Sequence, residues 1–303
     1  MYTNEGLIEE FENEKKTLND VLNELEIEII EKKDNIMIFD IKNVDCSIVN
    51  GIRRIIMSEI PTIAAEKIFM NQNTGVLPDE TLAQRIGLIP LHFDPDLLDF
   101  VANDVEEKNT LIFTLKIKNN QKEIKTVYSD DLVWIPKGEQ KSTFKNNEPF
   151  FLKRVPITKL SCGQELDLEI YCQKNIGKVH AKWSPVSLAS YRLMPKILLL
   201  DDFYDQEALK LQNCFSKGVI GIEEVDGRLK AFVQNPRLES MSREVLRHKE
   251  FDNRIYLGRV FQHYIFTIES IYIDPLSLLK KALLIFYQKC QHLKGEIDKC
   301  LIN

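Results

Sequence analysis

Residues 44–61, VDCSIVNGIRRIIMSEIP, predict one amphipathic helix about which the chain is organised. Apolar residues recur there at helical spacing and form a single stripe: Ile48, Ile52, Ile55, Ile56 and Ile60. Asp45 or Ser47 can cap the start of this helix, and Pro61 ends it because proline pushes the preceding residue out of the α region. Gly51 costs about 1 kcal/mol relative to alanine inside a helix. A glycine there indicates that another backbone or helix comes close.

Three polar residues of this helix, Asn50, Arg53 and Arg54, lie off the apolar stripe. Adjacent arginines beside a buried stripe are typical of a solvated face, because arginine is rarely buried. The planar fork of arginine also suits it to hold a carboxylate or carbonyl of another subunit. The helix alone leaves both interpretations open.

Two further segments bring a resemblance to a known family. The Asn-x-x-Arg-Arg helix is followed by DETLAQRIGLIPL at residues 79–91, and this pair of segments resembles the alpha-like subunits of cellular RNA polymerases. The block HAKWSP at residues 180–185 resembles the branch of that family shared by eukaryotic RNA polymerases I and III. The resemblance runs nearly continuously from residue 25 to residue 303.

Composition is that of an ordinary globular protein, without a membrane segment, a secretory signal or a cysteine metal motif. The 303 residues allow about two domains, and no apolar run approaches the roughly 18 residues of a membrane helix. The first residues show neither a basic region nor an apolar core, so we expect no secretory signal. Six cysteines are scattered without a Cys-x-x-Cys pair, which argues against a zinc ribbon and fits a reducing compartment.

Negative charge is concentrated at the N-terminus. Residues 1–34 hold eleven acids and four lysines, a net charge of −7, whereas the whole chain carries −6. The remainder is therefore almost neutral and would steer little toward phosphate. Residues 1–23 predict an acidic helical arm, either a solvated helix or a segment that docks onto a partner.

The middle of the chain predicts mainly strands. Alternation over residues 25–41 predicts a hairpin with a turn at residues 32–35, and Pro95 marks a boundary. Residues 109–197 are β-rich, and the polar residues 137–149 predict a loop. Residues 214–222 resemble a degenerate ferredoxin-like segment in which Cys214 stands alone, so we predict no iron–sulfur cluster and a core position for this cysteine.

The last predicted helix, residues 275–300, carries a heptad seam. Apolar side chains and cysteines alternate at spacings of four and three: Leu279, Leu283, Phe286, Cys290, Leu293, Ile297 and Cys300. Such a seam seeks another helix. Packing within the chain and packing against a second chain are both compatible with it.

Several kinds of catalytic or cofactor site are absent from the sequence. The five histidines show no metal-ligand spacing, and no phosphate-binding glycine loop is present. There is no Gly-x-Ser-x-Gly elbow, and no compact carboxylate motif of the kind that holds magnesium for nucleotidyl transfer. We therefore predict no cofactor, no bound metal and no catalytic residue in this chain.

The family resemblance implies an α+β fold and an assembly function. A dimerisation domain, residues 24–92 and 250–303, would consist of a sheet and two packed helices, interrupted by a β-rich insert at residues 93–249. By this resemblance the dimer interface, with the smaller alpha-like subunit, comprises Ile48, Ile52, Ile55, Ile56, Leu279, Leu283, Phe286, Cys290, Leu293 and Ile297. Docking to the second-largest subunit would use Asn50, Arg53, Arg54 and Arg85. Contacts with other subunits would use His180, Lys182 and Trp183. The small zinc-binding subunits are among the expected partners.

The same resemblance places the chain in the nucleus, including the nucleolus, as a non-catalytic subunit that meets nucleic acid only indirectly and no membrane. The alternative is an alpha-like subunit of another polymerase class, polymerase II or archaeal. A polymerase II counterpart would usually carry a cysteine zinc cluster in the insert, which this sequence lacks.

Overall fold

The computed structural model describes residues 23–101, 104–145 and 147–302, and the predicted acidic arm lies, apart from Asn23, outside them. The chain divides into two compact units. One comprises the described residues up to Lys32 with 38–49 and 190–267, and the other comprises 33–37, 50–189 and the residues from 268 onward. The predicted insert at 93–249 is therefore shared between the units, because residues 93–189 and 190–249 belong to different ones.

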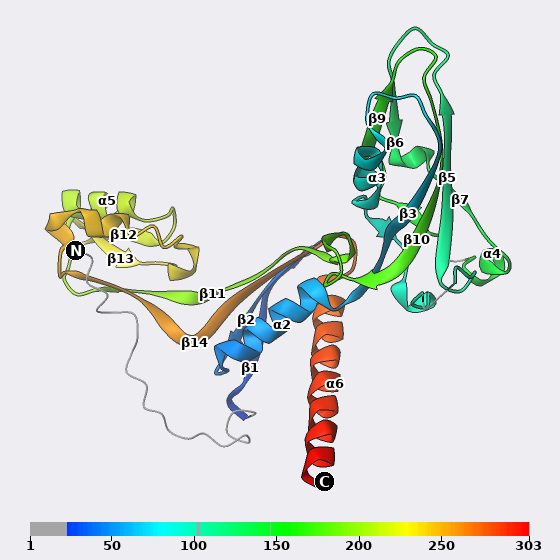
Figure 1. Cartoon of the computed structure of the whole chain (residues 1–303). Helices are drawn as coiled ribbons and strands as arrows, with labels where there is room; N and C mark the ends of the chain where they lie inside the picture. The colour runs from blue at the N-terminus through cyan, green and yellow to red at the C-terminus, as the bar shows by residue number, and fades with distance from the viewer. Residues whose placement is uncertain (1–22, 102–103, 146, 303) are drawn as a thin grey trace. The chain divides into compact units, whose positions relative to one another are not determined.

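The first unit contains a sheet with strand order β1-β2-β14-β11. These strands are β1 (Glu26–Lys33), β2 (Ile36–Lys42), β14 (Ile255–Ser270) and β11 (Val186–Leu199). The predicted hairpin is confirmed: β1 and β2 are joined by a two-residue turn whose Asp34 has a positive φ of 46°. Helix α5 (Asp205–Cys214) packs on the antiparallel pair β12 (Ile220–Val225) and β13 (Arg228–Val233), as Figure 1 shows.

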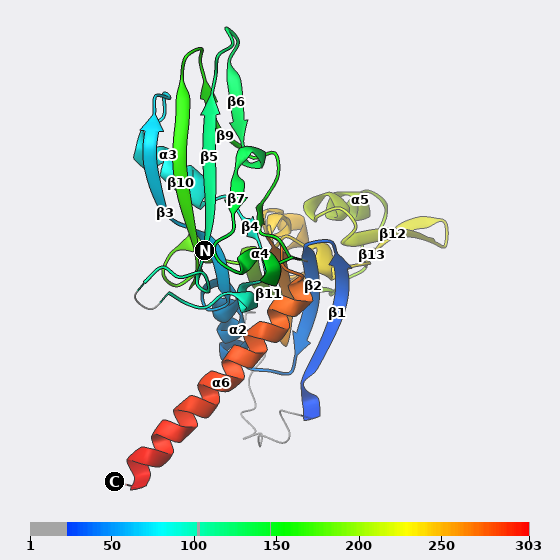
Figure 2. The same cartoon turned by 90° about the vertical axis from the view of Figure 1, so that its right-hand side faces the viewer.

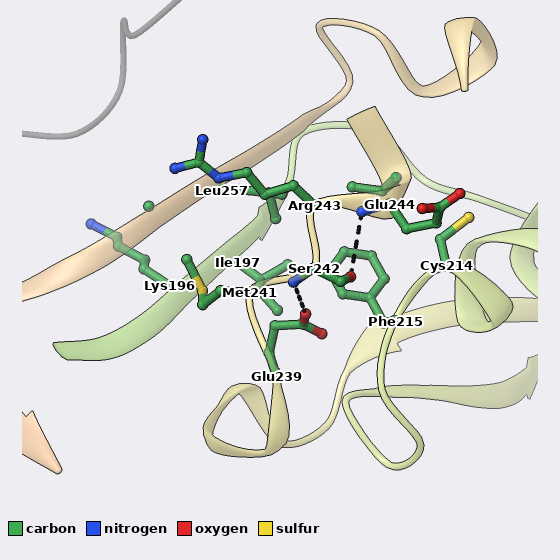
Figure 3. Close-up of a pocket in the computed structure, with 12 residues that line it drawn as sticks. Lys196, Ile197, Cys214, Phe215, Glu239, Met241, Ser242, Arg243, Glu244 and Leu257 are labelled. Carbon is green, nitrogen blue, oxygen red and sulfur yellow. Dashed lines mark hydrogen bonds between the residues drawn. The ribbon is translucent and has the colours of Figure 1, made fainter. Parts of the chain in front are cut away.

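The lone Cys214 ends α5 and is buried in the core of this unit, as predicted. Burial raises the pKa of its thiol. The adjacent cavity measures about 10 Å³ and lies among Phe215, Glu239 and Ser242 (Figure 3). That volume is at the lower limit for one water molecule. Across the described residues, no three histidine, cysteine or acidic side chains gather as a metal site would need.

The second unit is built on a sheet with strand order β3-β10-β5-β7. These strands are β3 (Pro61–Asn73), β10 (Glu165–Ile176), β5 (Thr110–Lys118) and β7 (Val133–Ile135). Two shorter antiparallel pairs join β4 (Leu91–His92) to β8 (Phe150–Phe151) and β6 (Lys125–Tyr128) to β9 (Pro156–Leu160). Helix α3 (Asp79–Gly87) contacts β3 and β9. The predicted loop at 137–149 contains one short helix, α4 (Gln140–Thr143), which the polar composition concealed.

Two helices complete the fold at the positions predicted for them. Helix α2 (Cys46–Ser58) begins where Asp45 accepts a hydrogen bond of 2.7 Å from the Ser47 backbone N–H. Hydrogen bonds from the side chain and backbone of Ser47 hold the pKa of Asp45 below its usual range, as expected for a capping carboxylate. Helix α6 (Pro275–Ile302) is the longest helix of the described chain, and Figures 1 and 2 both show its C-terminal half projecting beyond the other elements of its unit.

The mixture of separate helices and mainly antiparallel sheets confirms the predicted α+β class. None of the helices in the described part of the chain has the length and apolar character required to cross a bilayer.

Candidate subunit interface

The predicted seam of α6 is mostly uncovered. Leu279, near the start of the helix, is buried with 6% of its surface exposed, and Phe286 is half-buried. Beyond them Leu293 and Ile297 are 62% and 51% exposed. Leucine and isoleucine are usually buried in folded proteins. Packing within the chain therefore covers Leu279 and part of Phe286 but leaves Leu283, at 38% exposed, and the second half of the seam facing solvent.

Helices α2 and α6 approach each other at Gly51. A Cβ atom placed on Gly51 would lie 3.5 Å from the Phe286 ring, so the close neighbour indicated by this glycine is an aromatic ring of α6. Next to this contact lies a groove of about 450 Å³, lined by Gly51, Arg54, Ile55, Glu59, Phe286, Lys289, Cys290 and Leu293. An ion pair of 2.6 Å joins Lys289 of α6 to Glu59, the residue that follows α2. The groove continues the exposed seam of α6 onto α2.

The predicted interface stripe on α2 needs a correction. Ile52, Ile55 and Ile56 are at most 5% exposed and belong to the core of this chain, whereas Ile48 is 37% exposed. An exposed apolar stripe along α2 is therefore wrong for three of its four predicted residues. The sequence period identified a buried face, and this chain's own fold covers that face. Only Ile55 still lines the groove.

The two arginines of α2 differ in their surroundings. The Arg53 guanidinium donates two hydrogen bonds, of 3.1 and 3.0 Å, to Oδ1 of Asn50, one turn earlier, and a third to the sulfur of Met57. Arg54 is exposed, lines the groove and has no ion-pair partner within the described part of the chain. Of the two, Arg54 is the side chain whose fork is open to a partner.

Arg85, predicted to dock another subunit, is used within its own unit. Its Nε and one terminal nitrogen donate hydrogen bonds of 2.9 Å to the carbonyl oxygens of Ile157 and Pro156. These bonds attach α3 to β9. The guanidinium therefore has a structural task that the sequence did not reveal, because its acceptors lie more than seventy positions away.

The HAKWSP block is likewise occupied by contacts inside the second unit. Trp183 is only 1% exposed, and its indole N–H donates a hydrogen bond of 3.1 Å to the carbonyl of Gln173. Lys182 donates to the Ala65 carbonyl, pairs with Glu66 and lies 4.4 Å from the Trp183 ring centroid. The buried Trp183 side chain offers almost no surface to a partner in this chain, and its role at a subunit contact is not tested by this geometry. His180 is exposed, and its contact with another subunit stays a prediction.

Sequence reasoning missed Lys178, Glu59 and Lys289. Lys178 follows a glycine, Gly177, whose added Cβ would lie 2.3 Å from the Met57 carbonyl oxygen. The glycine before Lys178 was the only signal in the sequence, and its meaning becomes clear only once the fold is known. Glu59 and Lys289 pair across 230 positions, which no local pattern can indicate.

The comparison with known proteins agrees with this geometry. A family model described as the RNA polymerase Rpb3/Rpb11 dimerisation domain matches residues 38–290, a span that includes α2 and the first half of α6. The chain belongs to this family. The resemblance to alpha-like polymerase subunits is thereby confirmed.

Individual relatives distinguish between polymerase classes. The DNA-directed RNA polymerases I and III subunit RPAC1 of Homo sapiens is 38% identical over 293 residues, covering 90% of this chain and 84% of the relative. Its Saccharomyces cerevisiae counterpart is 40% identical, covering 85% and 83%. The RNA polymerase II subunit rpb3 of Dictyostelium discoideum is 28% identical, covering 95% and 99%. The chain is thus more similar to the subunits of polymerases I and III than to this polymerase II subunit.

Proposed function

We propose that this chain is a non-catalytic assembly subunit of RNA polymerases I and III. It pairs with the smaller alpha-like subunit, and the pair provides a platform for the second-largest subunit. Nucleotidyl transfer is carried out by other chains, and this one meets nucleic acid only through them. It acts in the nucleus, including the nucleolus, where such polymerases transcribe ribosomal and transfer RNA genes.

The observation that carries this proposal is the exposed second half of the α6 seam. Burying an apolar side chain contributes about 1.5–3 kcal/mol relative to leaving it exposed. Leu293 and Ile297 still expose more than half of their surface, so a partner helix would recover about half of that amount at each position. Together with the groove beside Phe286, this stripe fits the heptad packing of a helix from a second chain.

Docking of the second-largest subunit is assigned to the polar side of α2. Arg54 has an open guanidinium, and Asn50 fixes the orientation of Arg53 beside it. Arg85 is a weaker part of this proposal because two of its nitrogens already hold β9. His180, exposed at the start of its loop, remains available to one of the small zinc-binding subunits.

The proposal is tested by placing carboxylates on the exposed seam. In the double variant Leu293→Asp and Ile297→Asp, pairing with the smaller alpha-like subunit should weaken by at least about 100-fold, about 2.7 kcal/mol. Two apolar contacts are lost, and two charges would have to be desolvated at the interface. Both positions are exposed, so the chain itself should fold normally. Co-purification of the two tagged subunits and titration of the purified chains measure the effect.

A matched control uses the same chemical change off the seam. Leu284 is 56% exposed on α6 and lies roughly 100° around the helix from Leu283. Leu284→Asp should leave pairing intact. Equal pairing by the double variant and the wild type would reject the α6 interface, and loss of pairing in both variants would show that any charge on this helix is harmful.

A further inference from the structure

A basic hollow lies at the C-terminal end of α2, beside the groove described above. It has a volume of about 430 Å³ and is lined by Arg53, Arg54, Met57, Ser58, Glu59, Lys178 and Lys289. Four cations and one carboxylate thus meet in a chain whose net charge is −6. Arg54, Glu59 and Lys289 line both the hollow and the groove, so the two features are continuous.

We propose that this hollow receives carboxylates of an acidic segment from another polymerase subunit, with Lys178 and Arg54 as the groups that hold them. The inference rests on the proposed function, because the partner is taken to be a neighbouring protein of the assembly. It adds Lys178 and Lys289, which lie outside the docking residues predicted from the sequence.

The loop that carries Lys178 is fixed against α2 by its backbone. Gly177 has no space for a side chain, because a Cβ would lie 2.3 Å from the carbonyl oxygen of Met57. The Lys178 N–H donates a hydrogen bond of 2.8 Å to the carbonyl of Ser58, the last residue of the helix. A lysine from a distant part of the sequence is thereby held at a defined position in the hollow.

The charges of the hollow are only partly neutralised within the chain. Lys289 is paired with Glu59, and Arg53 donates to Asn50 and Met57. Neither Arg54 nor Lys178 has a side-chain ion-pair partner in the part of the chain that the structure describes. Like charges held close together repel one another, and an anion in the hollow would remove that repulsion. Guanidinium groups bind carboxylates through two parallel hydrogen bonds, and the lysine can supply a third.

An acidic protein segment fits the hollow better than nucleic acid does. A nucleic-acid surface is an extended basic face or stripe, whereas this hollow is a single concavity with Glu59 and Met57 in its wall. It also opens beside the groove in which the proposed partner helix lies.

Reconstitution of the complex provides the first test. Lys178→Glu should weaken binding of the purified alpha-like heterodimer to the second-largest subunit by at least about tenfold, and the loss should diminish at high salt. Lys122→Glu, the same change at an exposed lysine of the same unit, should have no effect. Heterodimer formation should be normal in both variants, which separates failure of this inference from failure of the proposed function.

Carbodiimide coupling provides the second test, since it joins a lysine amine directly to a carboxylate that contacts it. In the purified polymerase, mass spectrometry should find Lys178 joined to an aspartate or glutamate of another subunit. The Lys289–Glu59 pair, 2.6 Å apart, is the internal positive control. The inference is overturned if the control link forms and Lys178 stays unlinked, if Lys178 links to this chain's own acidic residues 1–22, or if Lys178 becomes reactive only after nuclease treatment.

Discussion

Replacing Trp183 with alanine should destabilise the second unit strongly, although the sequence alone placed this residue at a subunit contact. The side chain is 1% exposed, and truncating a buried tryptophan removes about 3–5 kcal/mol of stability. The Gln173 carbonyl, which accepts the indole N–H at 3.1 Å, would also lose its partner at a further cost of about 1 kcal/mol or more. We expect a total loss near 4–6 kcal/mol. Trp183→Phe keeps most of the apolar volume and should cost only about 1–2 kcal/mol.

The assay is urea unfolding followed by the fluorescence of Trp134. The chain has two tryptophans, and both lie in the second unit. In the alanine and phenylalanine variants Trp134 is therefore the sole reporter, and it reports on the unit that is perturbed. We expect the free energy of unfolding of the alanine variant to be at least about 2 kcal/mol smaller than that of the phenylalanine variant. A difference below about 0.5 kcal/mol, the range of surface substitutions, would refute it and return Trp183 to the surface.

Three further predictions concern the second unit. The His92 ring stacks on Phe150 and meets the tilted ring of Tyr272, and burial lowers the pKa of His92. The stability contributed by the neutral ring is therefore present above the unfolded pKa of about 6.5 and is lost as the pH falls below that value. His92→Phe should flatten the pH dependence of unfolding between about pH 7 and 5, and an unchanged slope would contradict this. Gly177→Ala should destabilise by about 1–3 kcal/mol, because its Cβ would meet the Met57 carbonyl at 2.3 Å. Gly51→Ala should instead stabilise the chain by up to about 1 kcal/mol, because its Cβ would meet the Phe286 ring at an ordinary distance of 3.5 Å. The same urea titration measures the free energy of unfolding of both glycine variants. Equal effects of the two substitutions would contradict the geometry.

Local sequence patterns predicted the elements that carry their own periodicity. The apolar spacing of residues 48–60 and 279–300 corresponds to α2 and α6, and alternation over residues 25–41 corresponds to the hairpin β1–β2. Gly51 indicated a close neighbour, which the structure identifies as Phe286. These features depend on residues near one another in the chain, so the sequence displays them directly.

Which apolar face stays exposed could not be predicted in the same way. Ile55 and Leu293 have similar hydrophobicity and helical spacing, yet one is 4% and the other 62% exposed. The difference depends on where distant segments pack, and local periodicity does not contain that information. The same limit applies to Arg85, whose acceptors on β9 are remote in sequence.

The mass of the purified complex tests the central claim most directly. This chain, of 35.3 kDa, would be co-expressed with the smaller alpha-like subunit of the same organism, purified through a tag and weighed by native mass spectrometry. The exposed α6 seam predicts one dominant species containing one copy of each subunit, and predicts that Leu293→Asp with Ile297→Asp converts it to separate chains. A wild-type chain that appears alone, or as two copies of itself, in the presence of the smaller subunit would contradict the account.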